Sequence, residues 1–288
     1  MKNFILAARP KTLLAGIVPP IVTYFYFHAR TGNHAIPWVI LCVAGALAIQ
    51  LATNFFNDVI DFTKGADAKR VGPTRVSAAG LVDIKTVNLW AWSSVAAAGL
   101  IGIPIILRGG LPFVVLGLIS LFLTFGYTGG KVSLAYRGLG ELFVFLFFGL
   151  FSVLGSYYLY SLSIDSGAVV LAAIYGLLTT TFICINNLRD RDTDREVGKR
   201  TLATRMERKA YIGLTLLTIF LPYLLTIKFV GKGPLFIIGV GLVPAMILAR
   251  ITVRKSGADL NEGLKFSGIH LVVFSVLLCG IFAYGSFL

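Results

Sequence analysis

Long apolar segments recur along the whole chain, and short polar stretches separate them. Each segment holds roughly 16 to 22 residues, close to the roughly 20 that a helix needs to cross the hydrocarbon core of a bilayer. The apolar runs are continuous, whereas the strands of a membrane barrel alternate apolar and polar positions. The pattern therefore predicts an all-α membrane protein, a single domain over 1–288. Nine transmembrane helices are expected, near 12–29, 36–54, 86–107, 111–127, 142–160, 168–186, 210–227, 234–249 and 268–287.

The composition agrees with a bundle of helices in lipid. Hydrophobic residues make up 57% of the 288 residues, charged residues only 14%, and the mean hydropathy is +0.84. A soluble domain of this length could not bury so much apolar surface. The first span is longer than the apolar core of a signal peptide and lacks a small-residue cleavage pattern, so we expect it to remain as a helix. Three cysteines lie singly in apolar spans and predict neither a disulfide framework nor a metal site: Cys42, Cys184 and Cys279.

The basic residues predict the orientation of the chain. Nine spans place 22 of the 26 Lys and Arg residues on the side of the N-terminus, which the positive-inside rule assigns to the cytoplasm. We therefore expect a multi-pass protein of the cell (inner) membrane, with the C-terminus on the opposite side. The charges are scattered over loops, which argues against nucleic-acid binding. Twelve of the 13 acidic residues fall on the same side, Asp165 being the exception, and acids contribute little to topology. The simplest explanation is that a functional site on that side needs their carboxylates.

Two acidic segments lie at the predicted cytoplasmic ends of the second and sixth spans. In the first, four polar side chains share a helix face at three- and four-residue spacing: Asn54, Asn57, Asp58 and Asp61. In the second, three lie in line at four-residue spacing: Asn186, Asp190 and Asp194. Stacked carboxylates repel one another and oppose the dipole at a helix C-terminus, so a bound cation is the simplest resolution.

The ligand types narrow the choice of cation. Oxygen ligands without nearby His or Cys favour Mg²⁺, which a few carboxylates hold while substrate phosphates complete its shell. A solvated polar cap on a helix would explain one such segment. Two matching segments at equivalent depth on non-adjacent helices favour a site for a phosphorylated substrate.

Both segments resemble the paired Asn-Asp-x-x-Asp and Asp-x-x-x-Asp motifs of the UbiA superfamily of intramembrane prenyltransferases. The resemblance covers essentially the whole chain, and the superfamily's nine-helix fold agrees with the number of spans. The longest matching stretches are NDVIDFTKGADAKRVGPTR from Asn57, NNLRDRDTDREVGKRTLATR from Asn186 and ARPKTL from Ala8. They most resemble the branch that acts on 1,4-dihydroxy-2-naphthoate in menaquinone synthesis. The general pattern would place an acid at Gly65, and the acid stands instead at Asp67. This displacement is similar to the naphthoate branch and argues against the 4-hydroxybenzoate branch.

The resemblance implies roles for particular residues. Metal-binding carboxylates are expected at Asp58, Asp61, Asp67, Asp190 and Asp194. Tyr127 and Lys131 resemble the family's Tyr-x-x-x-Lys element, in which Lys neutralises diphosphate and Tyr flanks the reacting carbon. Membrane anchoring and the positive-inside rule would also produce such a pair. The residues expected to bind substrate are Asn54, Asn57, Asp67, Arg70, Arg75, Asn186, Asn187, Lys199 and Arg200. The cationic ones are suited to phosphate oxygens, although topology alone would also explain them.

The implied reaction is Mg²⁺-dependent transfer of a polyprenyl group from a prenyl diphosphate to 1,4-dihydroxy-2-naphthoate, with decarboxylation, to give demethylmenaquinone. The expected partners are a polyprenyl diphosphate, an aromatic acceptor and membrane lipid, while the oligomeric state stays open. Other acceptors of the superfamily are the alternative: 4-hydroxybenzoate, homogentisate, haem, chlorophyllide or glyceryl phosphate. An ion-coupled transporter is more distant, because its acids would lie near mid-span rather than at span ends.

Overall fold

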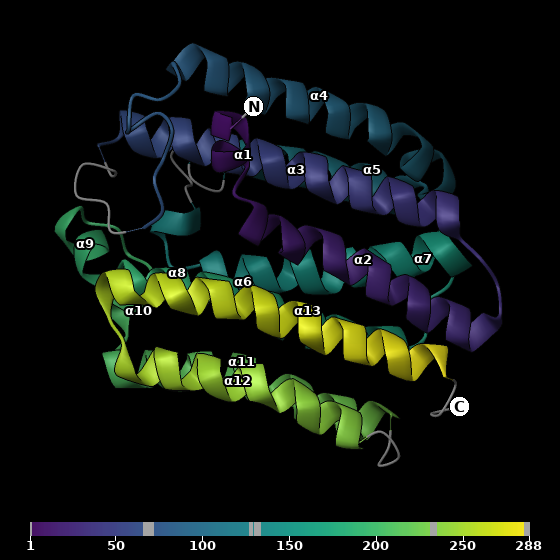
Figure 1. Ribbon diagram of the computed structural model, residues 1–288. Helices are drawn as coiled ribbons and strands as arrows, with labels where there is room; N and C mark the ends of the chain where they lie inside the picture. Colours follow the sequence, from purple (N-terminus) through teal and green to yellow (C-terminus); the bar gives the residue numbers. More distant parts are fainter. Residues whose placement is uncertain (1, 66–71, 127–128, 130–133, 231–234, 285–288) are drawn as a thin grey trace.

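The computed structural model describes residues 2–65, 72–126, 129, 134–230 and 235–284. In these ranges the chain forms helices and turns, with no strand, and the long helices run side by side as a bundle (Figure 1). The prediction of an all-α fold is therefore confirmed.

The first part of the chain forms five helices: α1 (Lys2–Ala8), α2 (Pro10–Thr31), α3 (Ile36–Thr63), α4 (Ile84–Gly109) and α5 (Leu111–Gly126). The middle part is more broken: η1 (Leu134–Tyr136), α6 (Gly140–Val144), η2 (Phe145–Leu154), α7 (Gly155–Ser161), α8 (Ser166–Arg189), α9 (Arg191–Glu196) and α10 (Leu202–Arg205). The last part returns to long helices: α11 (Arg208–Val230), α12 (Leu235–Arg254), the short η3 (Gly257–Leu260) and α13 (Asn261–Ala283).

Seven helical stretches of the described residues are long and apolar enough to cross a membrane: Pro10–Thr31, Ile36–Thr63, Ile84–Gly109, Gly140–Ser161, Ser166–Arg189, Arg208–Val230 and Gly257–Ala283. They correspond to seven of the nine predicted spans. The other two predicted spans fall on α5, an apolar helix of 16 residues, and on α12, a helix of 20 residues. The positions of all nine predicted spans thus coincide with helices, while the count of nine spanning helices is not exactly confirmed.

Several predicted boundaries were wrong. The second span was expected to end at 54, but α3 continues to Thr63 and carries the first acidic segment as helix. The last span was expected over 268–287, whereas α13 runs over Asn261–Ala283, because polar residues in its first turns hide its start from an apolar pattern. The middle of the fifth span, η2, is a π-helix, a wider winding that is often found at functional sites and that apolar periodicity does not distinguish.

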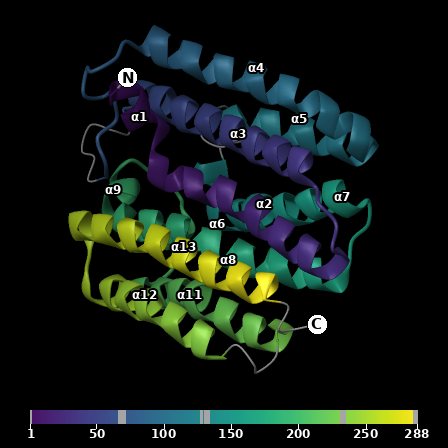
Figure 2. The ribbon, with the colours of Figure 1, turned by 45° about the vertical axis from the view of Figure 1, so that its right-hand side comes forward.

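The helix α8 forms the centre of the bundle, whereas α4 lies at its edge. Of the apolar window of each helix, 72% is buried in α8 and 11% in α4. A close crossing joins α8 to η2, since a Cβ added to Gly149 would lie only 2.4 Å from the Cα of Gly176. The helix α3 packs against α4 and α5. The helix α2 contacts both α3 and α13 and lies between them in both views (Figures 1 and 2). The space between α3 and α8 is where the site lies.

Candidate active site

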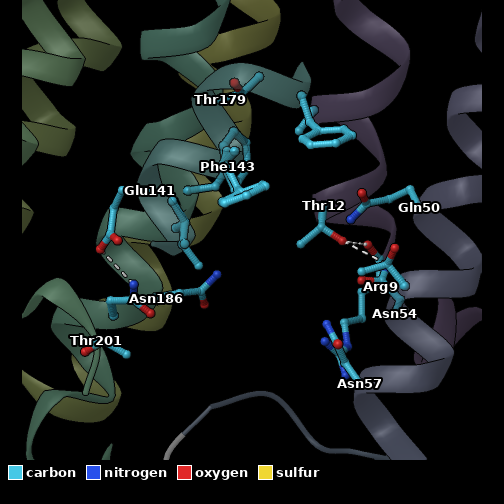
Figure 3. A pocket seen from close by; sticks show the side chains of 18 of the residues that line it. Arg9, Thr12, Gln50, Asn54, Asn57, Glu141, Phe143, Thr179, Asn186 and Thr201 are labelled. Atoms are coloured by element: carbon cyan, nitrogen blue, oxygen red, sulfur yellow. Dashed lines mark hydrogen bonds between the residues drawn. The ribbon is translucent and has the colours of Figure 1, made fainter. Parts of the chain in front are cut away.

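A cavity of about 270 Å³ lies between α3 and α8 at the end of the bundle that carries the acidic segments. Asp61 of the first segment and Asp190 and Asp194 of the second all line it. Figure 3 shows its two walls, with Asn54 and Asn57 on one side and Asn186 on the other. The two segments are far apart in the sequence, and the structure brings them to one shared cavity.

The two aspartates of α3 have different surroundings. Asp61 faces the cavity, where the Arg75 guanidinium donates to its Oδ2 at 2.5 Å and the Tyr136 hydroxyl donates to its Oδ1 at 3.4 Å. Asp58 is buried and does not line the cavity. Its oxygens accept the backbone N–H groups of Val76 at 3.2 Å and Ser77 at 3.0 Å. Asp58 therefore anchors the loop that carries Arg75, and Asp61 presents its carboxylate to the cavity.

The asparagines of α3 connect this helix to its surroundings. The Asn54 amide donates to the backbone oxygen of Ala8 at 2.8 Å and to the Thr12 hydroxyl at 3.1 Å. These bonds hold α3 against the end of α1 and the beginning of α2. The Arg75 guanidinium also donates to the backbone oxygen of Asn57. Arg75 thus binds α3 at a backbone carbonyl and at a carboxylate one turn further on.

The second acidic segment bends at Asp190, where α8 ends and α9 begins. Backbone bonds of 3.0 Å from Asp190 N–H to the Asn186 oxygen and of 2.7 Å from Asp194 N–H to the Asp190 oxygen preserve the four-residue spacing. The Asp190 carboxylate accepts two N–H groups of Arg189, at 2.7 and 2.6 Å. The Asp194 Oδ1 accepts the Lys199 ammonium at 3.3 Å.

The second oxygen of Asp194 is buried and has no hydrogen-bond partner among the described residues. Burial raises the pKa of Asp194 to about 6, with Lys199 opposing this rise and Asp190 adding to it. Burying a carboxylate oxygen without a partner destabilises the folded protein, because no hydrogen bond replaces the hydration that the oxygen has lost. A cation in the cavity would supply the missing interaction.

The carboxylates of the cavity are oxygen ligands of the kind that Mg²⁺ prefers. Asp61 lies on one wall, and Asp190 and Asp194 lie on the other. Within the described part of the chain, no three acidic, His or Cys side chains are grouped closely enough to hold a metal ion by themselves. Mg²⁺ is commonly held by one or two carboxylates, with waters and substrate phosphates completing its shell. The arrangement therefore suits a cation that is bound together with a phosphorylated substrate.

The rest of the cavity is divided into an aromatic wall and a polar wall. The aromatic residues come from α6, η2 and α8: Phe143, Phe147, Phe148 and Phe182. Polar residues of α2 and α3 line the opposite wall, among them Thr12, Gln50 and Thr53. Apolar pockets with a few placed polar groups are typical of small-molecule sites. The sequence did not separate these phenylalanines from the many that pack between helices.

Glu141 is a site residue that the sequence did not indicate. It lines the cavity, is 6% exposed, and its Oε1 accepts the Asn187 amide at 2.8 Å and the Tyr211 hydroxyl at 2.5 Å. The Oε2 of Glu141 is buried with no hydrogen-bond partner in the described structure. Glu141 fixes the orientation of Asn187. Its position as an acid at the start of an apolar span was the available signal, since such acids are rarely without function.

The predicted residues fall into three groups. Those that line the cavity are Asn54, Asn57, Asp61, Arg75, Asn186, Asn187, Asp190, Asp194 and Lys199. Two described residues lie outside the lining: Asp58, which holds the loop, and Arg200, whose backbone N–H donates to the Tyr136 oxygen at 3.2 Å. Four lie outside the described residues: Asp67, Arg70, Tyr127 and Lys131.

Comparison with known proteins agrees with this geometry. The sequence profile of the UbiA prenyltransferase family matches residues 17–276. The chain is 32% identical to the 1,4-dihydroxy-2-naphthoate octaprenyltransferase of Mycobacterium tuberculosis, over 99% of this chain and 98% of that protein. It is 35% identical to the protein of the same name in Haemophilus influenzae, over 69% of this chain and 67% of that protein.

Solved structures share the fold. A UbiA homolog from Archaeoglobus fulgidus, solved with GPP and Mg²⁺ bound, superposes with a TM-score of 0.68 at 14% identity, covering 98% of this chain and 99% of that chain. The apo structure of a UbiA homolog from Aeropyrum pernix K1 gives a TM-score of 0.68 at 15% identity, covering 92% of this chain and 96% of that chain. The arrangement of the helices is therefore that of known UbiA proteins.

Proposed function

The chain belongs to the UbiA prenyltransferase family and is a multi-pass membrane prenyltransferase, and from this premise we propose its substrates and metal. The donor is a polyprenyl diphosphate and the acceptor is 1,4-dihydroxy-2-naphthoate, which loses its carboxylate to give demethylmenaquinol, the reduced form of demethylmenaquinone. The observation that carries the proposal is the single cavity that joins acidic residues of α3 and of α8–α9 to an aromatic wall. The names of the relatives in Mycobacterium and Haemophilus support the acceptor.

The acidic end of the cavity is the proposed diphosphate site. Asp61, Asp190 and Asp194 would hold Mg²⁺ together with the diphosphate, because they are the carboxylates of the two acidic segments that line the cavity, and one oxygen of Asp194 is buried without a partner in the described structure. When bound, Mg²⁺ would stabilise the charge that develops on the leaving diphosphate. Arg75 and Lys199 also line this end, and their cations suit phosphate oxygens.

The aromatic wall is the proposed site of the prenyl chain. Phe143, Phe147 and Phe148 offer apolar surface to a hydrocarbon and keep water away from the reacting carbon. The bond between that carbon and the diphosphate oxygen breaks, and its electron pair leaves with the diphosphate. A ring carbon of the acceptor then bonds to the allylic cation, and release of carbon dioxide restores the aromatic ring.

The orientation in the membrane follows from charge. The 22 Lys and Arg residues on the N-terminal side support a cytoplasmic N-terminus, as the positive-inside rule requires. The acidic end of the cavity would then open towards the cytoplasm, where charged substrates are available. The prenyl chain would extend from there into the bundle.

An acceptor panel tests the proposal directly. The purified protein in detergent is incubated with Mg²⁺, a polyprenyl diphosphate and, in separate reactions, 1,4-dihydroxy-2-naphthoate, 4-hydroxybenzoate or homogentisate. Mass spectrometry should detect a prenylated naphthol product that has lost the mass of carbon dioxide, and EDTA should abolish its formation. Prenylation of 4-hydroxybenzoate in its place would contradict the acceptor, and transfer to none of the three would contradict aromatic prenylation.

A further inference from the structure

Tyr136 lies in η1, between α5 and α6, and belongs to neither acidic segment, yet it contacts both sides of the site. Its hydroxyl donates to the Asp61 carboxylate at 3.4 Å. Its backbone oxygen accepts the N–H of Arg200, in the loop after α9, at 3.2 Å. A single residue therefore connects the end of α3 to the loop that follows the second acidic segment.

Two lysine ammonium groups lie against the ring of Tyr136. The Nζ of Lys64 is 4.5 Å from the ring centroid, and the Nζ of Lys199 is 5.5 Å from it. Both distances are within the range of about 6 Å in which a cation is attracted to an aromatic ring. Lys64 follows α3 directly, and Lys199 pairs with Asp194 at 3.3 Å. The ring thus gathers one cation from the neighbourhood of each acidic segment.

Contacts between a cation and an aromatic ring are attractive but weak, and this strength suits the two lysines to binding a ligand. Two ammonium groups near the same ring repel each other, and the electron-rich ring offsets part of that repulsion. A contact between a cation and a ring is weaker than a charge-assisted hydrogen bond to a phosphate oxygen. The ring therefore keeps the two ammonium groups near the carboxylates without competing strongly with a phosphate oxygen for them.

We propose that Tyr136 is a positioning residue that gathers Lys64 and Lys199 at the acidic end of the cavity, where they bind the diphosphate of the donor. The identity of this ligand rests on the proposed function. The role concerns the diphosphate of the donor, because Tyr136 contacts Asp61 and Lys199 contacts Asp194.

Two substitutions separate the ring of Tyr136 from its hydroxyl. The readouts are calorimetric titration of the full-length protein with inorganic diphosphate in the presence of Mg²⁺, and the KM values for prenyl diphosphate and for acceptor. Tyr136→Leu should weaken diphosphate binding and raise the donor KM by about tenfold, since it removes two cation–π contacts. Tyr136→Phe keeps the ring and should retain most of the affinity. The acceptor KM should stay unchanged in both variants.

A matched control uses Tyr24, a half-buried tyrosine of α2 whose hydroxyl bonds to His34 at 2.8 Å and which does not line the cavity. Tyr24→Leu should leave diphosphate binding unchanged. In a Lys64→Ala/Lys199→Ala background, Tyr136→Leu should have no further effect, because the ring then has no cation to hold. The double lysine variant also tests the claim with the ring intact, and it should itself lose diphosphate affinity.

Several results would overturn the proposal: wild-type diphosphate affinity in Tyr136→Leu, equal weakening by Tyr136→Phe and Tyr136→Leu, or full affinity in the double lysine variant. An equal rise in donor and acceptor KM would also contradict it, because that result indicates a general structural role. A different result would contradict the proposed function without deciding the role of Tyr136. A wild-type protein that binds Mg²⁺ and diphosphate but prenylates no aromatic acceptor would contradict the acceptor assignment, while the titrations would still decide the role of Tyr136.

Discussion

The acidic segment of α3 and that of α8–α9 carry similar residues at similar spacing, yet the structure surrounds their carboxylates differently. On α3, backbone N–H groups occupy both oxygens of Asp58, and Asp61 is bonded by a guanidinium and a hydroxyl. On α8–α9, the neighbouring Arg189 occupies Asp190, while Asp194 keeps one buried oxygen without a partner among the described residues. The α3 segment thus forms a rigid wall that is largely satisfied by the protein. The α8–α9 segment holds the carboxylate that most requires a bound cation.

The comparison predicts its largest effect at Asp194. Asp194→Asn removes the carboxylate whose second oxygen is buried without a partner in the described structure, so it should lower kcat by a factor of about 10³ or more, a loss typical of removing a main electrostatic contact. Steady-state rates at saturating Mg²⁺ measure this. The matched control is Asp192→Asn in the same short helix, where the Asp192 side chain is 91% exposed, and its activity should be normal. Comparable losses of kcat in the two variants would contradict the special role of the Asp194 carboxylate.

Asp58 and Asp61 should separate into a structural and a functional carboxylate. Asp61→Asn should lower kcat about 10²-fold and raise the Mg²⁺ concentration needed for half-maximal rate. Asp58→Asn should lower the free energy of unfolding by about 1–3 kcal/mol, because an amide cannot accept both backbone N–H groups of the loop. Thermal unfolding and Mg²⁺ titrations of activity distinguish them. A larger shift in Mg²⁺ requirement for Asp58→Asn than for Asp61→Asn would make Asp58 the metal ligand.

The smallest predicted effect is the pH dependence of the stability of the metal-free protein. Burial raises the pKa of Asp194 to about 6, above its ordinary value of 3.8, so the folded protein binds a proton that the unfolded chain releases at the same pH. Stability in EDTA should therefore increase as the pH falls from 7.5 to 5.5, by roughly 1 kcal/mol. Melting temperatures across this window measure the gain, and Asp194→Asn should lose it. A variant that keeps the same pH dependence would show that another group is responsible.

The sequence indicated most of the fold and the location of the site, for physical reasons. Apolar runs as long as a bilayer is thick identify helices directly, and the distribution of charge gives the side on which the acids lie. The equivalent depth of the two segments on one side of the membrane brought Asp61 towards Asp190 and Asp194, and all three line one cavity. Helical spacing also grouped Asp58 with Asp61, because residues three apart share a face, and only the contact with the loop at 76–77 separates them.

The contacts that the sequence did not predict are long-range ones. Glu141 meets Asn187 and Tyr211 through the packing of three helices, and no spacing along the chain encodes that meeting. Tyr136 reaches Asp61 from a short turn that resembles any other polar connection. The π-helical η2 crosses α8 closely at Gly149 and Gly176, which are far apart in the sequence.

The central claim is that both acidic segments bind one diphosphate through Mg²⁺. Calorimetric titration with inorganic diphosphate, with and without Mg²⁺, tests it most directly on the wild-type protein and on Asp61→Asn and Asp194→Asn. Binding should require Mg²⁺ in the wild type and should be lost in either variant, since each removes one wall of the site. Binding that persists without Mg²⁺, or wild-type affinity in either variant, would contradict the claim.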